Sequence, residues 1–335
     1  TPSSVDERPN PPTDPAWVKT LRPGWQKERQ ANFQRAVMEF PLPGEPDLVC
    51  DLWTEISRNP SAELQADGWP ELTPEAFAAR REVVDYQVME RLRRRVAAMV
   101  KDPRTADALK PWYRFACKRP LSSDEYYPVF NQPHVTLIDV SDTRGVERIT
   151  ANGFVASGVE YAVDCIIFAS GFEVTSDLER RWGIDVVAGR DGRSIYDHWR
   201  HGPRTLHGTM THGFPNQFYI GYIQGGLNAS VTEQFGRQGE HIAYVIGEAL
   251  KRGIAAVEPT LEAQEAYVRH FEEVEIDTSQ LQRECTPSYS TNEGQVKDPW
   301  ALLRSYGPGW PAFMTLLREW RDKGDLEGLY RTSMQ

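Results

Sequence analysis

A basic pair, Lys118 and Arg119, is the first place in this sequence where chemistry can be suspected. It follows Cys117 and precedes Pro120, where a helical region gives way to a region with strand patterns. Arginine stays charged at any working pH and offers a rigid fork of N–H donors, which suits a phosphate or a developing oxyanion. Exposed basic pairs are also common on ordinary surfaces, so the pair alone leaves a plain surface role open.

A second candidate is the stretch 223–230, which leads from an apolar pattern at 217–222 through a glycine pair into a helix predicted over 231–251. Ser230 and Glu233 have the spacing of a capping box. Free backbone N–H groups and the positive end of the helix would then meet at Asn228, Ala229 and Ser230 and could hold an anion or a polarised carbonyl. A tight connection without any ligand is the alternative.

Three histidines, His201, His207 and His212, raise the question of a metal site. Their spacings of six and five residues cross Pro203 and Gly208, which suits neither one face of a helix nor the usual ligand pairs. The sequence therefore predicts no metal site.

The strand patterns predict an α/β fold with a mixed sheet. The run 163–172 is apolar and β-branched and ends at Gly171 and Phe172, as in a strand buried on both faces. Ligands of open α/β sheets lie beyond the carboxyl ends of strands, and a residue without Cβ lets them approach the backbone. A plain core strand that ends in a turn is the alternative. A hairpin is predicted at Asn152-Gly153, before the run 163–172. The segment 135–140 is a further strand candidate.

The helical patterns lie in two regions. Apolar residues recur at spacings of seven and four over 73–100, which predicts one long helix. Its Arg91, Arg94 and Arg95 point away from this stripe, which favours a solvated face over the alternative of a phosphate-binding patch. Further helices are predicted over 260–276, on the surface, and over 311–323.

Composition excludes some classes of partner. A net charge of -10 and a pI near 5.3 argue against nucleic acid or anionic lipid as the principal partner, because both select basic surfaces. No run of eighteen apolar residues encodes a membrane span, and four scattered cysteines suit reduced thiols. We therefore expect a cytoplasmic protein. The chain opens on Thr1 in a proline-rich stretch, which suggests a connection from a preceding element.

Several ordered motifs, read together, resemble Baeyer–Villiger monooxygenases. The first motif covers CKRPL at 117–121, YY at 126–127, FN at 130–131 and VTLIDV at 135–140. Then follow DCIIFASGFE at 164–173, GPRT at 202–205 and GFPN at 213–216. The order and spacing agree over essentially the whole chain, although Ser170 replaces the usual threonine.

The resemblance implies an enzyme that uses FAD, NADPH and dioxygen to insert one oxygen atom beside a ketone carbonyl, through a peroxyflavin, giving an ester or lactone. Arg119 matches the active-site arginine of the family, and Lys118 matches a residue near the nicotinamide. Gly171 and Phe172 fall where a strand tip approaches the flavin. The loop of Asn228, Ala229 and Ser230 would face its pyrimidine side. Tyr289 falls in a mobile carboxyl-terminal region of the family, where many members have tryptophan.

The family's glycine motifs for FAD and NADPH have no counterpart, because no G-x-G-x-x-G occurs in the chain. We therefore expect the carboxyl-terminal half of a Rossmann-like protein with two dinucleotide-binding domains, whose partner is the missing amino-terminal half. This chain alone is expected to bind FAD poorly and to be inactive. The expected parts are a linker at 1–16, a helical insert at 17–112, a nicotinamide-domain segment at 113–162, a flavin-domain part at 163–276 and a mobile region at 277–335.

Two alternatives remain open from the sequence. An N-hydroxylating or sulfur-oxidising flavin monooxygenase shares the strand motif at 164–173 but is disfavoured by CKRPL at 117–121. A remnant or binding module without catalysis would keep the fold and would not need Arg119. The sequence does not identify the ketone.

Overall fold

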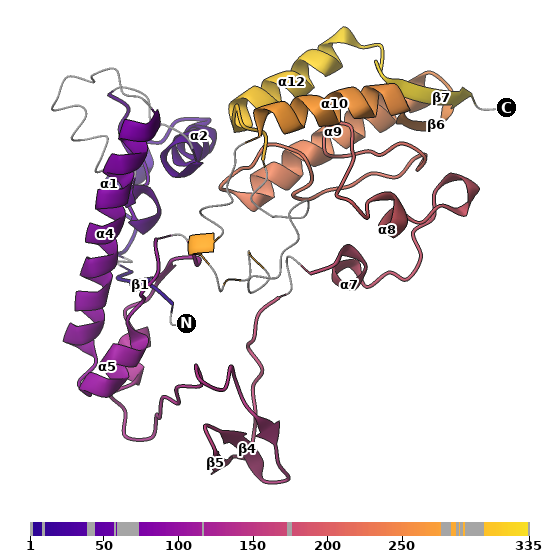
Figure 1. Ribbon diagram of the computed structural model, residues 1–335. Helices are drawn as coiled ribbons and strands as arrows, with labels where there is room; N and C mark the ends of the chain where they lie inside the picture. Colours follow the sequence, from indigo (N-terminus) through magenta and orange to yellow (C-terminus); the bar gives the residue numbers. More distant parts are fainter. Residues whose placement is uncertain are drawn as a thin grey trace. The chain divides into compact units, whose positions relative to one another are not determined.

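The computed structural model divides the chain into two compact units (Figure 1). Unit 1 consists of Thr1–Trp25 and Pro43–Phe172, and unit 2 of Gln26–Leu42 and Glu173–Gln335. The residues that the structure describes are 3–8, 11–38, 44–56, 58, 74–115, 117–172, 176–275, 283–285, 288, 291 and 305–333.

Unit 1 is organised around one long helix, α4 (Pro74–Met99), which confirms the helix predicted over 73–100. Proline at its first position lacks only an N–H that a helix start leaves unpaired anyway. The side chain of Phe77 lies outside the described part. The other members of the predicted stripe are all buried: Val84, Val88, Leu92, Val96 and Val100.

The arginines of α4 do not form the plain solvated face that was predicted. Arg91 donates two hydrogen bonds of 2.8 and 2.9 Å to the carboxylate of Asp6, and Arg95 donates one of 3.0 Å to that of Asp124. Arg94 is exposed, as expected. The prediction failed because the partners of Arg91 and Arg95 come from chain segments far away in sequence, which periodicity does not reveal.

Short elements complete unit 1. Strands β1 (Val5–Asp6) and β2 (Leu121–Ser122) pair in parallel, with Val5 opposite Leu121. The remaining elements are α1 (Pro15–Thr20), α5 (Pro103–Leu109), α6 (Tyr126–Val129), β3 (Arg148–Ile149), β4 (Gly153–Ala156) and β5 (Val159–Ala162).

Strands β3, β4 and β5 form a small antiparallel meander, and they confirm the hairpin predicted at Asn152-Gly153. The amide of Thr150 donates to the carbonyl of Gly153 across the turn at 2.9 Å. A Cβ at Gly153 would lie 1.8 Å from the carbonyl oxygen of Tyr161, so the close pairing of β4 and β5 requires glycine there.

The three segments predicted as sheet strands, 135–140, 163–172 and 217–222, do not form strands. In the second segment Ile167, Phe168 and Phe172 are exposed, by 85%, 76% and 90%. The prediction of a strand buried on both faces is therefore wrong for this structure. A strand needs neighbours that pair with its N–H and C=O groups, and the described residues supply none beside these segments.

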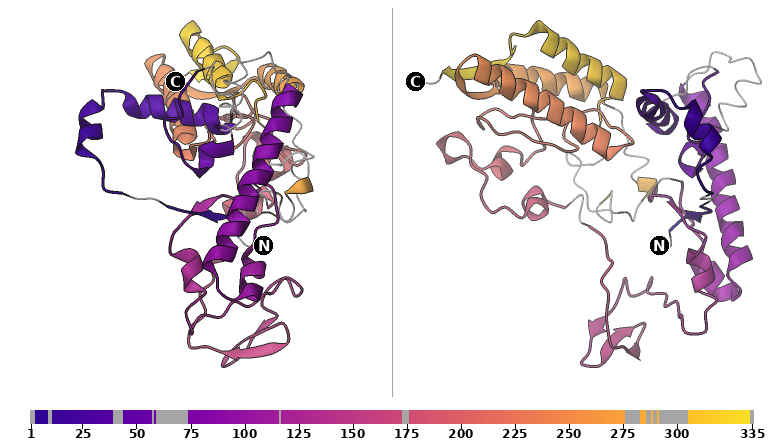
Figure 2. Two further views of the ribbon diagram at one scale, coloured as in Figure 1. Left: turned by 90° about the vertical axis from the view of Figure 1, so that its left-hand side faces the viewer. Right: turned by 180° about the vertical axis from the view of Figure 1, so that it is seen from behind.

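Unit 2 combines three long helices with a pair of antiparallel strands, β6 and β7, at one end of them (Figures 1 and 2). The helices predicted over 231–251, 260–276 and 311–323 are confirmed as α9, α10 and α12. The elements are α2 (Trp25–Met38), α7 (Leu178–Trp182), η1 (Arg190–Gly192), α8 (Ile195–His198), α9 (Val231–Lys251), β6 (Ile254–Pro259), α10 (Leu261–Val274), α12 (Trp310–Lys323) and β7 (Leu329–Ser333).

The core of unit 2 lies between these three helices. Helix α10 contributes Tyr267 and Phe271 to this core. Its acidic residues Glu262, Glu272 and Glu273 are exposed, so the helix predicted on the surface is there and also buries one apolar face. Helix α12 contributes Phe313, Leu317 and Trp320 at spacings of four and three residues, which is one helical face. A second cluster surrounds Trp199 below helix α8.

Helix α9 buries a face that is polar in its first half. Gln234, Gln238 and His241 are at most 1% exposed, and Val245 and Ala249 continue the same face. The apolar pattern of the sequence predicts an inward stripe of Phe235, Ile242, Val245, Ile246 and Ala249; Val245 and Ala249 confirm it, whereas Phe235 and Ile242 are only half-buried and Ile246 is exposed. Buried amides need partners, and the turn before the helix provides them: the amide of Gly221 donates to Gln238 at 3.0 Å.

The cysteines differ in part from the expectation of four reduced thiols. Cys50 and Cys165 are free and exposed. Cys117 and Cys285 are disulfide-bonded, so the expectation is wrong for these two. Among the described helices, none is long and apolar enough to cross a membrane.

Candidate active site

The segment of Lys118 and Arg119 is held in place by its flanks. The amide of Phe115 donates to the buried carboxylate of Asp85 at 2.9 Å, and the amide of Leu121 donates to the carbonyl of Ser4 at 3.0 Å. Between these two anchors Cys117 and Pro120 are buried, whereas Lys118 is half-buried and Arg119 is exposed. The backbone is thus fixed on both sides of a basic pair that faces outward.

The two basic side chains lie against aromatic rings. The Arg119 Cζ atom is 5.6 Å from the ring centre of Trp53, and the Lys118 Nζ atom is 5.8 Å from that of Tyr113. Both distances lie within the range of a cation–π attraction, which orients a cation without neutralising its charge.

Arg119 has no ion pair among the described residues, unlike Arg91, Arg95 and Arg114 of the same unit. Arg91 and Arg95 are paired with carboxylates, and the Nε of Arg114 is 3.5 Å from Asp85. Burial, the largest influence, raises the pKa of Asp85 above its ordinary value. The uncompensated guanidinium of Arg119 is therefore the group of this segment best able to receive an anionic oxygen.

Gly171 and Phe172 lie at the end of the unpaired segment 163–172. Gly171 has a φ of 88°, in the left-handed region that favours glycine, and open space surrounds the place of a Cβ. Phe172 is 90% exposed. Among the residues described in unit 1, no hydrogen bond, ion pair or ring contact joins either of them to Lys118 or Arg119.

In unit 2 the backbone N–H groups of the predicted flavin loop are already occupied. The amide of Asn228 donates to Gln234 at 3.0 Å, and that of Ala229 donates to Gln34 at 2.7 Å. The amide of Ser230 donates to the Asn228 side chain at 2.8 Å. The prediction that these N–H groups are free is therefore wrong for this structure, because buried side-chain amides satisfy them first.

The predicted capping box at the start of α9 is also absent. Ser230 is the N-cap residue, but its side chain makes no capping hydrogen bond. Glu233 instead accepts from the Nε of Arg237, one turn later, at 2.8 Å. The ion pair along the helix surface competes successfully with the cap.

Sequence reasoning missed Gln34 of α2, which is 4% exposed. Its carboxamide accepts from the amide of Ala229 and donates to the carbonyl of Leu227 at 3.1 Å, so it clamps the loop before α9. Helix α2 has a weak apolar pattern, and nothing in that pattern marks Gln34 as an inward residue. Tyr289, the last predicted site residue, lies outside the described residues.

Comparison with known proteins supplies the context for these residues. No family model matches the chain. Pentalenolactone D synthase of Streptomyces exfoliatus is 39% identical over 331 residues, which are 98% of this chain and 56% of that protein. A Baeyer–Villiger monooxygenase of Streptomyces coelicolor is 41% identical over 325 residues, 96% of this chain and 53% of that protein.

Solved structures agree with the sequence relatives. The polycyclic ketone monooxygenase of the thermophilic fungus Thermothelomyces thermophila matches with a TM-score of 0.81 at 34% identity, over 99% of this chain and 55% of that one. A closed structure of cyclohexanone monooxygenase matches with a TM-score of 0.69 at 24% identity, over 100% and 61%, and shows the fold alone. The predicted α/β fold class is thereby confirmed. By sequence and by fold, this chain is a relative of the Baeyer–Villiger monooxygenases and spans about half the length of the chains that it matches.

Proposed function

We propose that this chain forms part of a monooxygenase that inserts one atom of dioxygen beside a ketone carbonyl and so produces an ester or lactone. The relatives named as Baeyer–Villiger monooxygenases support this reaction class. A relative named as an FAD-binding monooxygenase and NADP-bound structural neighbours support FAD and NADPH as cofactors. FAD, once reduced by NADPH, would supply the activation of dioxygen.

The observation that carries the proposal is the state of Arg119. Its guanidinium is exposed, lies 5.6 Å from the ring centre of Trp53, and has no carboxylate partner among the described residues. Oxygen insertion beside a carbonyl places negative charge on oxygen, and a preorganised cation stabilises such charge at little reorganisation cost. Arg119 would hold that oxygen, and the neighbouring Lys118 would contact the nicotinamide cofactor.

The proposed flavin contacts come from short backbone segments. Gly171, whose backbone is open on its Cα side, would let the isoalloxazine approach closely, with Phe172 beside it. The loop of Asn228, Ala229 and Ser230 would face the pyrimidine side of the flavin. Since its N–H groups are taken by Gln34, Gln234 and Asn228, the loop fits the flavin through other groups or after one of these side chains moves.

The decisive experiment replaces Arg119 by alanine in a complete enzyme that carries both glycine motifs. Removal of one donor to a developing oxyanion costs roughly 10²–10³ in kcat. We expect ester formation to fall by at least that factor, while NADPH still reduces the flavin under anaerobic conditions. Product analysis by gas chromatography and stopped-flow absorbance measure the two steps separately.

Arg94→Ala is the matched control, because Arg94 is an exposed arginine of the same unit on α4. It should leave both steps unchanged. Unimpaired ester formation by the Arg119→Ala enzyme would refute the assigned role, and it would favour the reading of this chain as a non-catalytic module.

We also propose that the chain needs a further dinucleotide-binding part, the amino-terminal half of the family's chain, to hold FAD. The absence of G-x-G-x-x-G from the sequence and the coverage of about half of each relative support this. The purified 335-residue chain should show little flavin absorbance after incubation with FAD and gel filtration. A stoichiometric yellow protein would contradict the proposal.

A further inference from the structure

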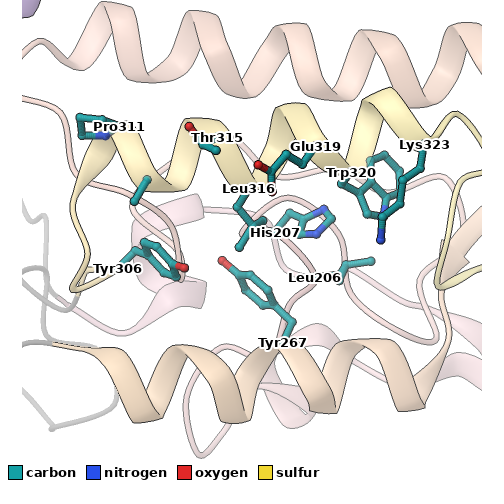
Figure 3. A pocket seen from close by; sticks show the side chains of 11 residues that line it. Leu206, His207, Tyr267, Tyr306, Pro311, Thr315, Leu316, Glu319, Trp320 and Lys323 are labelled. Carbon is teal, nitrogen blue, oxygen red and sulfur yellow. The ribbon is translucent and has the colours of Figure 1, made fainter.

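Unit 2 contains a cavity of about 640 Å³ between α10 and α12, and nothing in the proposed oxygenation uses it (Figure 3). Tyr267 enters it from α10, Leu316 and Trp320 from α12, and Tyr306 from the chain before α12. Its volume lies in the range of pockets that hold drug-sized molecules, and such pockets combine apolar walls with a few placed polar groups.

One such polar group is the imidazole of His207, which lines the cavity although the residue is only 4% exposed. Its Nδ1 lies 3.3 Å from Nε2 of the fully buried His241. Its Nε2 has no hydrogen-bond partner among the described residues. Burial lowers the pKa of both rings, that of His241 to about 3, so the pair is neutral.

The second histidine decides which proton faces the cavity. Nδ1 of His241 is buried and has no partner in the described part of the chain. If that atom carried the proton, a buried N–H donor would be left unpaired, which is costly. The favoured arrangement therefore has Nε2–H of His241 donating to Nδ1 of His207. Nε2 of His207 then carries a proton, and this N–H donor has no hydrogen-bond acceptor among the described residues.

The aromatic walls have already used their polar atoms. The hydroxyl of Tyr267 donates to the carbonyl of Gln224 at 2.6 Å, and Nε1 of Trp320 donates to that of Glu327 at 3.0 Å. Tyr267 and Trp320 therefore present mainly the faces and edges of their rings to the cavity, and another ring system packs well on these surfaces. Glu319 and Lys323 also line the cavity with opposite charges, so the wall favours neither an anionic nor a cationic ligand over a neutral one.

The backbone at His207 is in the left-handed region, which few residues other than glycine adopt and which histidine tolerates better than most. His207 and Gly208 have φ values of 56° and 69° in a tight turn closed by the amide of Leu206, which donates to the carbonyl of Met210 at 2.8 Å. Such turns favour asparagine and glycine. A side chain kept in a sparsely populated backbone region at a cavity wall is the kind of strain found at ligand sites.

We propose that this cavity is a second small-molecule site, which takes a neutral, ring-containing carbonyl compound whose oxygen accepts a hydrogen bond from Nε2 of His207. The inference goes beyond the proposed oxygenation and requires no flavin, because every wall belongs to unit 2. Binding can therefore fail or succeed independently of the function proposed for Arg119.

Matched probes test the proposal on the 335-residue chain without FAD. 4-Phenylcyclohexanone supplies the carbonyl, and phenylcyclohexane has the same rings without it. Isothermal titration should give saturable binding of the ketone, at one site, that is roughly two- to ten-fold tighter than that of the hydrocarbon, the value of one neutral hydrogen bond. Phenyltrimethylammonium, a cation that aromatic rings also attract, should bind more weakly than the ketone.

Three variants and one control variant test where the ligand binds. His207→Gly tolerates the backbone conformation but removes the donor, so it should abolish the preference for the ketone. His207→Asn keeps an N–H donor and tolerates the same turn, so it should retain part of that preference. Leu316→Trp should fill the cavity and remove binding, whereas Arg318→Trp, on an exposed part of α12 that does not line the cavity, should not. Thermal unfolding shows that each variant is folded.

The outcomes separate the proposal from its rivals. Preference for the ketone that is lost in His207→Gly and in Leu316→Trp supports it. Equal binding of ketone and hydrocarbon, or tighter binding of the cation, overturns the donor assigned to His207. Ketone binding that survives Leu316→Trp, or no saturable binding up to the solubility of the probe, overturns the site itself.

Discussion

Acid should destabilise unit 2 through the buried His241. Its side chain is fully buried, and desolvation, aided by the charge of Arg321, lowers its pKa to about 3. In the unfolded chain a histidine has a pKa of about 6.5. Between these two values the unfolded state binds the proton and the folded state does not. The free energy of unfolding therefore falls as the pH drops below about 6.5, and the fall continues to about pH 3.

The size of the effect follows from the width of this interval. Each pH unit below about 6.5 costs about 1.4 kcal/mol for one histidine that stays neutral in the folded state. Between pH ~7.5 and pH ~5 His241 alone should thus remove about 2 kcal/mol. Burial also lowers the pKa of His207, so this residue too should lower the free energy of unfolding as the pH falls. This loss is a large fraction of the stability of an ordinary domain, which is about 5–15 kcal/mol.

Urea unfolding at a series of pH values measures the slope, with fluorescence of the tryptophans as the signal. His241→Gln removes the titrating group and should flatten the slope by about 1.4 kcal/mol per pH unit over this interval. The same change at the exposed His201 should leave the slope as it is in the original chain. An identical slope in the His241→Gln variant would refute the argument, because it would mean that His241 does not fold as a neutral, proton-excluding group.

Three further substitutions test the packing around the loop and the helices. Gln34→Leu leaves the amide of Ala229 and the carbonyl of Leu227 without their partner and should cost about 2–6 kcal/mol in urea unfolding, at about 1–3 kcal/mol per orphaned group. Gly226→Ala would bring a Cβ within 2.9 Å of Phe313, so calorimetry should show a loss of about 1–3 kcal/mol. Thr260→Ala removes the hydroxyl that accepts from the amide of Ala263 at the start of α10 and should cost about 1 kcal/mol; no loss would show that water replaces the cap.

Local signals predicted the helices well. Helices α4 (Pro74–Met99), α9 (Val231–Lys251) and α12 (Trp310–Lys323) match their expected ranges within one or two residues, since helix hydrogen bonds close within a few residues and depend on local sequence. The hairpin at Asn152-Gly153 is local in the same sense. Its turn dipeptide and its two strands, β3 and β4, lie within ten residues of each other.

Long-range pairing could not be predicted. The inward residues of α9 are Gln234, Gln238 and His241 because the backbone of Gly221 and the ring of His207 supply partners for them. Hydropathy alone assigns such polar residues to the surface. The hydrogen bonds of Gln34 could not be predicted for the same reason, because the partners of Gln34 are almost two hundred positions away in the chain. Residue type and spacing found Arg119 only through the resemblance to a family.

The partnerless groups on which the two proposals rest differ in kind between the two units. In unit 1 they are a bare guanidinium at Arg119 and the exposed apolar run 163–172, whose β-branched composition suits a strand that is buried on both faces. In unit 2 they are single ring nitrogens, Nε2 of His207 at the wall of the cavity and the buried Nδ1 of His241. A charge and an apolar segment gain most from a macromolecular or cofactor surface that covers them. One buried N–H gains most from a small acceptor, and this is why we assign oxygen chemistry to Arg119 and a separate binding site to His207.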